Sequence, residues 1–110
     1  LNEHPAVAAS AVAATPDPVR GDEVLACIVL RKVPGLPPQD RIAISIVKHA
    51  LVRLAYFKAP GYIAFVDALP LTPSQKIQRG DLREIARSMP GKPNCWDLRE
   101  LKRRRKKREP

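Results

Sequence analysis

The sequence has few aromatic residues and no long hydrophobic run. Only five of its 110 residues are aromatic, so a core must be built mainly from Ala, Val, Ile and Leu. No apolar run approaches the roughly 20 residues that a membrane-spanning helix requires. The start of the chain lacks both an initiator Met and a signal-peptide pattern, so we interpret the sequence as a segment of a longer polypeptide.

Cysteine is also scarce. The chain contains Cys27 and Cys95 alone, which is too few for a disulfide framework, and Cys27 lies in an apolar run where we expect it to be buried. Neither cysteine has neighbours at metal-ligand spacing, and His4 and His49 have no partner at the spacing of a metal site or a catalytic triad. We therefore predict no metal site and a reducing, cytoplasmic compartment.

The positive charge is concentrated at the C-terminal end. The net charge is +9, of which residues 99–109 contribute +6 and residues 1–98 contribute +3. A basic run of this kind is typical of a solvated tail, so we expect residues 91–110 to form a flexible basic tail.

Two other interpretations of the basic run are open. Basic residues neutralise nucleic-acid phosphates, which would fit a small nucleic-acid-binding module. Against it, the rest of the chain lacks interleaved aromatic residues and a recognised binding motif. The run could also contact anionic lipid, although Trp96 and Leu98 are too few to make an amphipathic face.

The N-terminal third predicts two paired strands. Residues 6–14 are small and apolar and end at a Pro-rich segment. Alanine favours helix by propensity, but we predict a strand there, in part because of the family resemblance described below. Residues 24–30 form an uninterrupted apolar run whose Val and Ile content suits a strand buried on both faces. We expect the two to form an antiparallel pair connected around residues 15–22.

The remainder alternates helices with a short strand. Residues 39–54 predict a helix, because its apolar residues recur at helical spacing: Ala43, Ile46, Val47, Ala50, Leu51 and Leu54. Residues 62–66 predict a strand, and residues 82–88 a second helix capped by Asp81. Residues 1–90 are thus expected to form an α+β domain, with a short, mainly antiparallel sheet of about three or more strands covered by two to three helices.

Three segments resemble the C-terminal domain of the adenylate-forming superfamily, in its acyl-CoA synthetase branch. They are His4-Pro5-Ala6-Val7 with PDPVRGDEV at residues 16–24, LAYFKAP at residues 54–60, and FVDALPLTPSQKIQR at residues 65–79. The third contains the pattern Leu-Pro-x-Thr-x-x-x-Lys-Ile-x-Arg, which is fairly specific. The resemblance covers about residues 1–88, and its strength comes from the order and spacing of all three segments.

The resemblance implies a lid domain that works with a large N-terminal domain of the same polypeptide. Such enzymes activate a carboxylic acid with ATP to an acyl-adenylate, with Mg²⁺ accompanying the ATP. The small domain then rotates, and CoA takes the acyl group. The large domain is absent from this sequence, so we expect the 110 residues alone to bind no cofactor and to be inactive.

The resemblance also assigns candidate site residues. Lys76 matches the family's active-site lysine, which would stabilise charge on the phosphoryl oxygens during adenylation. In some members this lysine is reversibly acetylated, which removes its charge. Lys58 is a candidate for CoA phosphates, or an ordinary solvated charge. Arg79 is a candidate for supporting the lysine loop or contacting the large domain, or a surface arginine. Most members have Gly before the lysine, whereas this chain has Gln75.

An adenylation domain of a peptide synthetase is the alternative within the superfamily, because Leu-Pro-x-Thr-Pro also occurs there. The segment at residues 17–23 and the strand at residues 65–67 favour the CoA ligases. The acid substrate is left open, since the large domain determines it.

Overall fold

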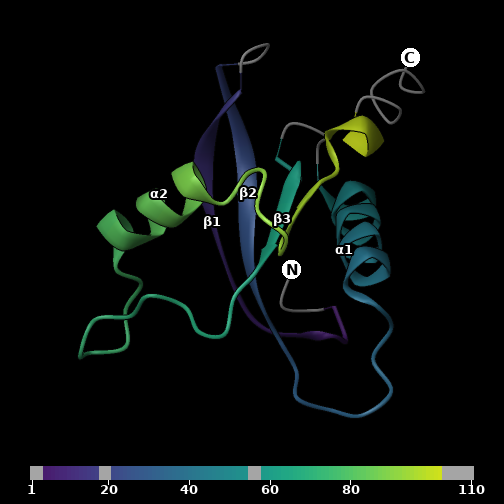
Figure 1. Cartoon of the computed structure of the whole chain (residues 1–110), viewed down its shortest axis with the longest axis horizontal. Coiled ribbons are helices and arrows are strands. Elements are labelled where there is room, and N and C mark those ends of the chain that lie inside the picture. The colour runs from purple at the N-terminus through teal and green to yellow at the C-terminus, as the bar shows by residue number, and fades with distance from the viewer. Residues whose placement is uncertain (1–3, 18–20, 55–57, 103–110) are drawn as a thin grey trace.

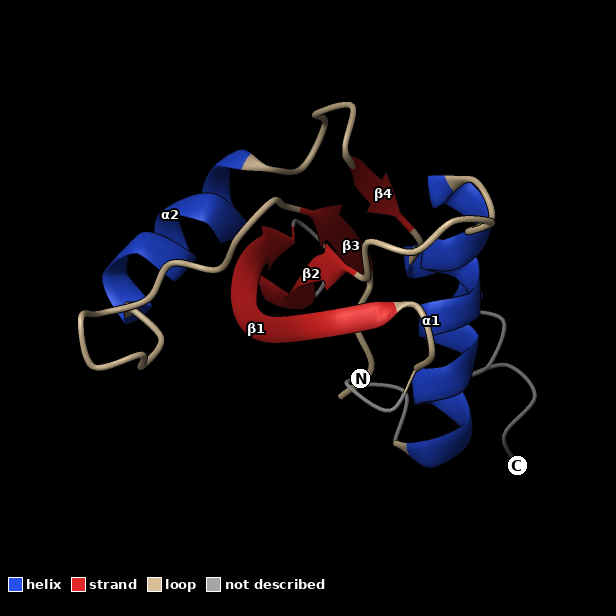
Figure 2. Cartoon of the chain, turned by 90° about the horizontal axis from the view of Figure 1, so that it is seen from below, coloured by secondary structure: helices blue, strands red, loops and turns tan. Residues whose placement is uncertain are grey.

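The computed structural model describes residues 4–17, 21–54 and 58–102. Its centre is a four-stranded sheet in the order β1-β2-β3-β4, formed by β1 (Val7–Asp17), β2 (Gly21–Leu30), β3 (Tyr62–Phe65) and β4 (Cys95–Asp97). Helices α1 (Gln39–Arg53) and α2 (Arg79–Ser88) lie on opposite sides of this sheet (Figures 1 and 2). The α+β class and the mainly antiparallel sheet are confirmed.

The β1–β2 hairpin is longer than the sequence indicated. The antiparallel pairing continues to Asp17 opposite Gly21, so most of the connection expected at residues 15–22 is strand; residues 18–20 lie outside the described part. Pro16 is compatible with pairing because β1 is the edge strand, where one missing N–H donor is tolerated. Gly21 has φ +83°, a conformation that glycine adopts without steric cost.

Helix α1 connects two parallel strands. β2 and β3 pair in parallel, and parallel neighbours require a crossover that α1 provides. The predicted inward face is confirmed for five residues, and Ile42 is buried with them. Leu54 is the exception: it has an extended backbone beyond the helix end and is 44% exposed. The expectation that Leu54 packs inward is therefore wrong.

The core lies on both faces of the sheet. On one face α1 packs against alternate residues of β2 and β3, including Ala26, Ile28 and Ile63. On the other face α2 places Leu82 and Ala86 against the intervening strand residues, Leu25, Cys27, Tyr62 and Ala64. The predicted burial of the second strand on both faces is thus confirmed for its central residues.

The C-terminal segment extends the fold beyond the predicted domain boundary. Residues 95–97 pair antiparallel with β3, and a helical turn follows at residues 99–102. Trp96, Leu98 and Leu101 pack against the α1-side core. The expected tail at residues 91–110 therefore does not begin at residue 91, because these apolar side chains attach residues 95–102 to the sheet.

Helix α2 begins three residues earlier than predicted. Gln78 is its N-cap with an extended backbone, and its carbonyl accepts the Leu82 N–H at 3.0 Å. Asp81 does not cap the helix and instead lies in its first turn, where a carboxylate still complements the helix dipole.

Candidate functional site

A hairpin between β3 and α2 carries Lys76. Leu71 and Ile77 form an antiparallel bridge, and the Gln78 N–H donates to the Pro70 carbonyl at 2.8 Å. These two contacts bring the arms of the loop together before α2 begins. Figure 1 shows the loop reaching away from the sheet beyond the end of β3.

The tip of this hairpin is a tight turn. The Gln75 N–H donates to the Thr72 carbonyl at 2.9 Å, which closes a four-residue turn with Pro73 at its second position, the position that proline favours. Thr72 in turn donates its N–H to the Lys76 carbonyl at 2.7 Å. Its hydroxyl accepts the Lys76 N–H at 3.2 Å and lies 3.1 Å from the Ser74 hydroxyl.

Gln75 has a left-handed backbone with φ +67°, the one positive φ of a non-glycine residue in the part of the chain that the structure describes. A turn followed by a left-handed residue is a common three-residue hairpin, and glycine is the residue that suits that position. The loop thus keeps the shape that glycine would favour although a larger side chain is present. We expect this conformation to cost about 1–2 kcal/mol relative to glycine.

The Lys76 side chain is exposed at the end of this turn. Its backbone is held through both its N–H and its carbonyl by Thr72, whereas its ammonium group extends on a long, flexible stem. Lysine is a compact point charge with three donors. Chemically, the arrangement offers a cation that can reach an anionic group on a surface facing the hairpin.

The structure does not bring the other two candidate residues into one cluster with Lys76. Arg79 is the exposed first residue of α2 and lines a hollow of about 280 Å³ between this helix and β1, together with Arg83 and Val12. Lys58 is exposed and precedes β3, whereas the Lys76 hairpin follows β3. The two lysines therefore belong to segments that meet opposite ends of this strand.

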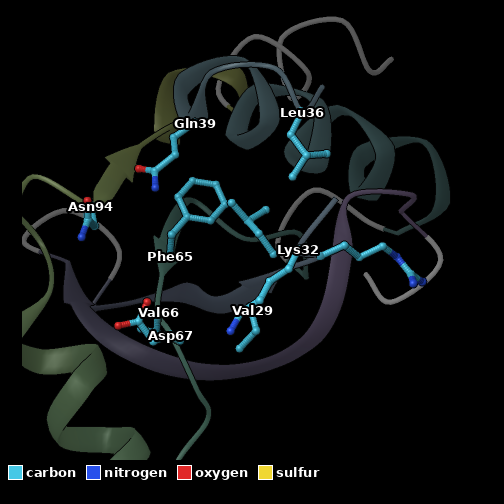
Figure 3. A pocket seen from close by; sticks show the side chains of 10 residues that line it. Val29, Lys32, Leu36, Gln39, Phe65, Val66, Asp67 and Asn94 are labelled. Carbon is cyan, nitrogen blue, oxygen red and sulfur yellow. The ribbon is translucent and has the colours of Figure 1, made fainter. Parts of the chain in front are cut away.

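A second hollow lies where the parallel strands β2 and β3 end, and Figure 3 shows it from close by. It has a volume of about 320 Å³ and is lined by ten residues. Phe65 and Leu36 supply an apolar wall, while Lys32, Asp67 and Asn94 supply polar groups. The sequence did not indicate this hollow, because its lining residues come from segments far apart along the chain.

A buried ion pair joins the C-terminal turn to β2. The Lys102 ammonium lies 2.5 Å from a Glu23 carboxylate oxygen, and each side chain is only 2% exposed. The same oxygen accepts the Val24 N–H at 2.8 Å. Gly61 makes room for the carboxylate, since a Cβ atom there would lie 2.6 Å from the Glu23 side chain. The sequence does not indicate this pair, because Lys102 begins a basic run and is separated from Glu23 by 79 positions.

The two histidines meet in the structure, although neither has a partner at metal-site or triad spacing in the sequence. The His4 and His49 rings lie edge to face with centroids 5.7 Å apart. His4 accepts the Ala6 N–H on Nδ1 at 3.1 Å, so neutral His4 carries its proton on Nε2, which lies 2.8 Å from the Ser45 hydroxyl. Burial, followed by the neighbouring His49, lowers the pKa of His4 below its ordinary value of 6.5. This cluster favours neutral His4 and anchors the N-terminal segment to α1.

The cysteines are buried thiols. Cys27 is fully buried, and Cys95 is half-buried against the same core cluster. Burial raises the pKa of the Cys27 thiol to about 11. Burial, Cys27 and Asp97 together raise that of Cys95 to about 11. Within the described ranges, no group of three His, Cys, Asp or Glu side chains is placed to hold a metal ion.

The fold and the hairpin together define a small α+β domain that carries an exposed lysine on a hydrogen-bonded turn. Residues 1–76 match the model of the AMP-binding enzyme C-terminal domain, and Lys76 is the last matched position. The chain belongs to this family.

Its curated relatives are acyl-CoA synthetases and CoA ligases by name. Acyl-coenzyme A synthetase ACSM3 of Rattus norvegicus, named as mitochondrial, is 42% identical over 83 residues, which cover 76% of this chain and 14% of that protein. The 4-hydroxybutyrate–CoA ligase 1 of Metallosphaera sedula is 46% identical over 84 residues, again 76% of this chain and 14% of the relative.

Solved structures have the same fold. An acyl-CoA synthetase of Brucella canis superposes with a TM-score of 0.69 at 39% identity, covering 77% of this chain and 15% of that one. The anthranilate CoA ligase AuaEII, solved in complex with anthranoyl-AMP, gives 0.66 at 38% identity over 76% of this chain and 16% of that one. The chain thus spans about one seventh of the proteins that it matches. Its described helices include none long and apolar enough to cross a bilayer.

Proposed function

We propose that this chain is the C-terminal lid domain of an AMP-forming acyl-CoA ligase and that Lys76 is its adenylation lysine. The observation that carries the proposal is the hairpin, which holds the Lys76 backbone by two hydrogen bonds to Thr72 while leaving its side chain exposed. The names of the relatives, which are acyl-CoA synthetases and CoA ligases, support the same reaction class.

The chemistry follows from the charge of Lys76. An acid carboxylate attacks the α-phosphate of ATP, a P–O bond forms, and the bond to pyrophosphate breaks. Negative charge then accumulates on the phosphoryl oxygens, where a positioned ammonium stabilises the transition state. After rotation of the domain, the CoA thiol attacks the adenylate carbonyl, and AMP leaves. The Mg²⁺ that accompanies ATP would be held by the large domain, since the described residues offer no metal cluster.

The remaining candidate residues take supporting roles in this proposal. Arg79 begins α2 three residues after Lys76 and would support the loop or contact the large domain. Lys58, exposed before β3, would attract CoA phosphates by charge. In contrast, Lys102 is buried with Glu23 and is not available to nucleic-acid phosphates, which weighs against the nucleic-acid-binding alternative.

The proposal also includes a reducing cellular compartment. Two free thiols in the described residues suit a reducing compartment. The cytoplasm remains our prediction, although several relatives are named as mitochondrial.

The test uses the polypeptide that carries this chain together with its large domain. Acid-dependent ATP–pyrophosphate exchange is measured over a panel of carboxylic acids for the wild type, for Lys76→Ala and for the matched control Lys92→Ala, which removes another exposed loop lysine. We expect Lys76→Ala to lower the exchange rate by about 100-fold or more while sparing thioester formation from preformed adenylate. Lys92→Ala should change neither rate, and the 110 residues alone should catalyse no exchange.

The outcomes separate the parts of the proposal. Wild-type activity that survives Lys76→Ala would keep the enzyme class and remove the role of Lys76. Equal loss in both half-reactions would show that Lys76 does not act in adenylation specifically. Absence of exchange with every acid tested would overturn the ligase proposal itself.

A further inference from the structure

Thr72 is the residue through which the hairpin holds Lys76. Its carbonyl closes the turn by accepting the Gln75 N–H, and its N–H donates to the Lys76 carbonyl. Its hydroxyl accepts the Lys76 N–H at 3.2 Å. One residue therefore contacts both backbone polar groups of Lys76.

The hydroxyl completes a short chain of hydrogen bonds. Thr72 Oγ1 accepts from the Lys76 N–H and also lies 3.1 Å from the Ser74 hydroxyl, where either hydroxyl can be the donor. Thr72 is half-buried, whereas the turn residues 73–76 are exposed. The threonine is thus the inner anchor of a turn whose other residues face outward.

The anchor matters because the turn contains a disfavoured conformation. Gln75 holds φ at +67°, so the turn competes with alternative loop shapes in which this residue relaxes. Each hydrogen bond from Thr72 favours the hairpin over those shapes. Without the hydroxyl, the Lys76 N–H would lose its protein acceptor. The Lys76 backbone would then be less restrained, and its ammonium would occupy a wider range of positions.

We infer that Thr72 is the positioning residue for Lys76, its hydroxyl holding the lysine backbone in the turn so that the ammonium is placed for adenylation. The inference rests on the proposed function for its catalytic consequence. The structural part, that the hydroxyl holds the turn, does not depend on that function. Thr72 itself touches no substrate in this scheme and acts through Lys76.

The test compares two substitutions in the polypeptide that carries the large domain. Thr72→Val keeps the shape of the side chain and removes the hydroxyl, whereas Thr72→Ser keeps the hydroxyl. Ser74→Ala is the matched control, because it removes the neighbouring hydroxyl but leaves the acceptor of the Lys76 N–H in place. Amide hydrogen exchange by mass spectrometry on peptides covering residues 70–78 measures how often the hydrogen bonds of the turn open.

We expect Thr72→Val to speed amide hydrogen exchange in this segment about tenfold, with Thr72→Ser and Ser74→Ala within about twofold of the wild type. In ATP–pyrophosphate exchange, Thr72→Val should lower kcat about tenfold with the KM for ATP unchanged. Thioester formation from preformed adenylate should keep its rate, and Thr72→Ser should restore adenylation.

The possible failures are distinguishable. Unchanged amide hydrogen exchange in Thr72→Val would overturn the positioning role whatever the activity shows. A faster-exchanging turn with full adenylation activity, in an enzyme that Lys76→Ala inactivates, would overturn the catalytic consequence of Thr72 alone. A wild type without pyrophosphate exchange would overturn the proposed function and this consequence with it, while amide hydrogen exchange would still decide whether Thr72 holds the turn.

Discussion

The buried pair of Glu23 and Lys102 predicts a large loss of stability when the lysine is truncated. Both side chains are 2% exposed and their charged atoms are 2.5 Å apart. Lys102→Ala would break this buried ion pair by removing one partner, which typically costs about 3–5 kcal/mol. Domains of this length have a total stability of roughly 5–15 kcal/mol. The substitution is therefore expected to remove about a fifth or more of the free energy of unfolding.

The assay is urea unfolding of the 110-residue chain followed by circular dichroism, with thermal unfolding in parallel. A loss of this size should lower Tm by about 15–30 °C. Lys92→Ala, at an exposed position, is the matched control and should stay within about 0.5 kcal/mol of the wild type.

Two further variants separate charge from packing. Lys102→Met retains most of the apolar stem, so a comparable loss would come from removal of the ammonium beside the buried Glu23 carboxylate. Combining it with Glu23→Leu replaces both charges by apolar groups, which is often close to neutral. The double variant should recover most of the stability, less about 1 kcal/mol for the Val24 N–H that loses its acceptor. Stability of Lys102→Ala within 1 kcal/mol of the wild type would refute the reasoning.

Three other predictions concern the turn, the histidines and the thiols. Gln75→Gly should raise the free energy of unfolding by about 0.5–1 kcal/mol in urea titrations, because relief of the left-handed strain exceeds the added entropy of the unfolded chain; a loss would contradict the strained turn. Stability should fall as pH drops below 6.5, because His4 binds a proton there in the unfolded chain but not in the folded one, where its pKa is lowered. The loss is complete below the folded-state pKa. In urea midpoints measured from pH 7.5 to 5, His4→Gln should reduce this dependence of stability on pH. Cys27 and Cys95 should react with a thiol reagent about 100-fold more slowly than ordinary cysteines, because raising the pKa from 9.0 to about 11 lowers the thiolate fraction by that factor; rapid labelling of the native protein would contradict their burial.

Sequence patterns predicted the elements that are long enough to show a period. The 15 residues of α1 place an apolar residue at each inward position, and the apolar run of β2 is long enough to indicate burial on both faces. Strand β4 has three residues, which is too short to show an alternation of apolar and polar side chains. Its position depends instead on pairing with β3, which is more than 30 positions away in the chain.

The candidate site likewise divides into features set by neighbours in sequence and features set by contacts between distant segments. Lys76 could be singled out as a candidate because its motif is local and its neighbours in sequence are also its neighbours in the turn. The partner of Lys102 could not, because the pair joins positions 79 apart and the charge run around Lys102 indicated solvent. The half-buried anchor at Thr72 required the hydrogen bonds of the hairpin, which residue identity alone does not specify.

The position of β1 at the edge of the sheet has a consequence for how the domain can be handled. This strand has eleven residues, rich in Ala and Val, and no other strand pairs with its outer edge within the described part of the chain. Long, weakly charged edge strands are templates for pairing with a second chain, and proline near an end is one means of blunting them. Pro16 removes one donor close to the hairpin turn, which leaves the middle of β1 as the segment where self-association of a concentrated sample would begin. A lysine at exposed Val12 would be the first substitution to keep such a sample monodisperse.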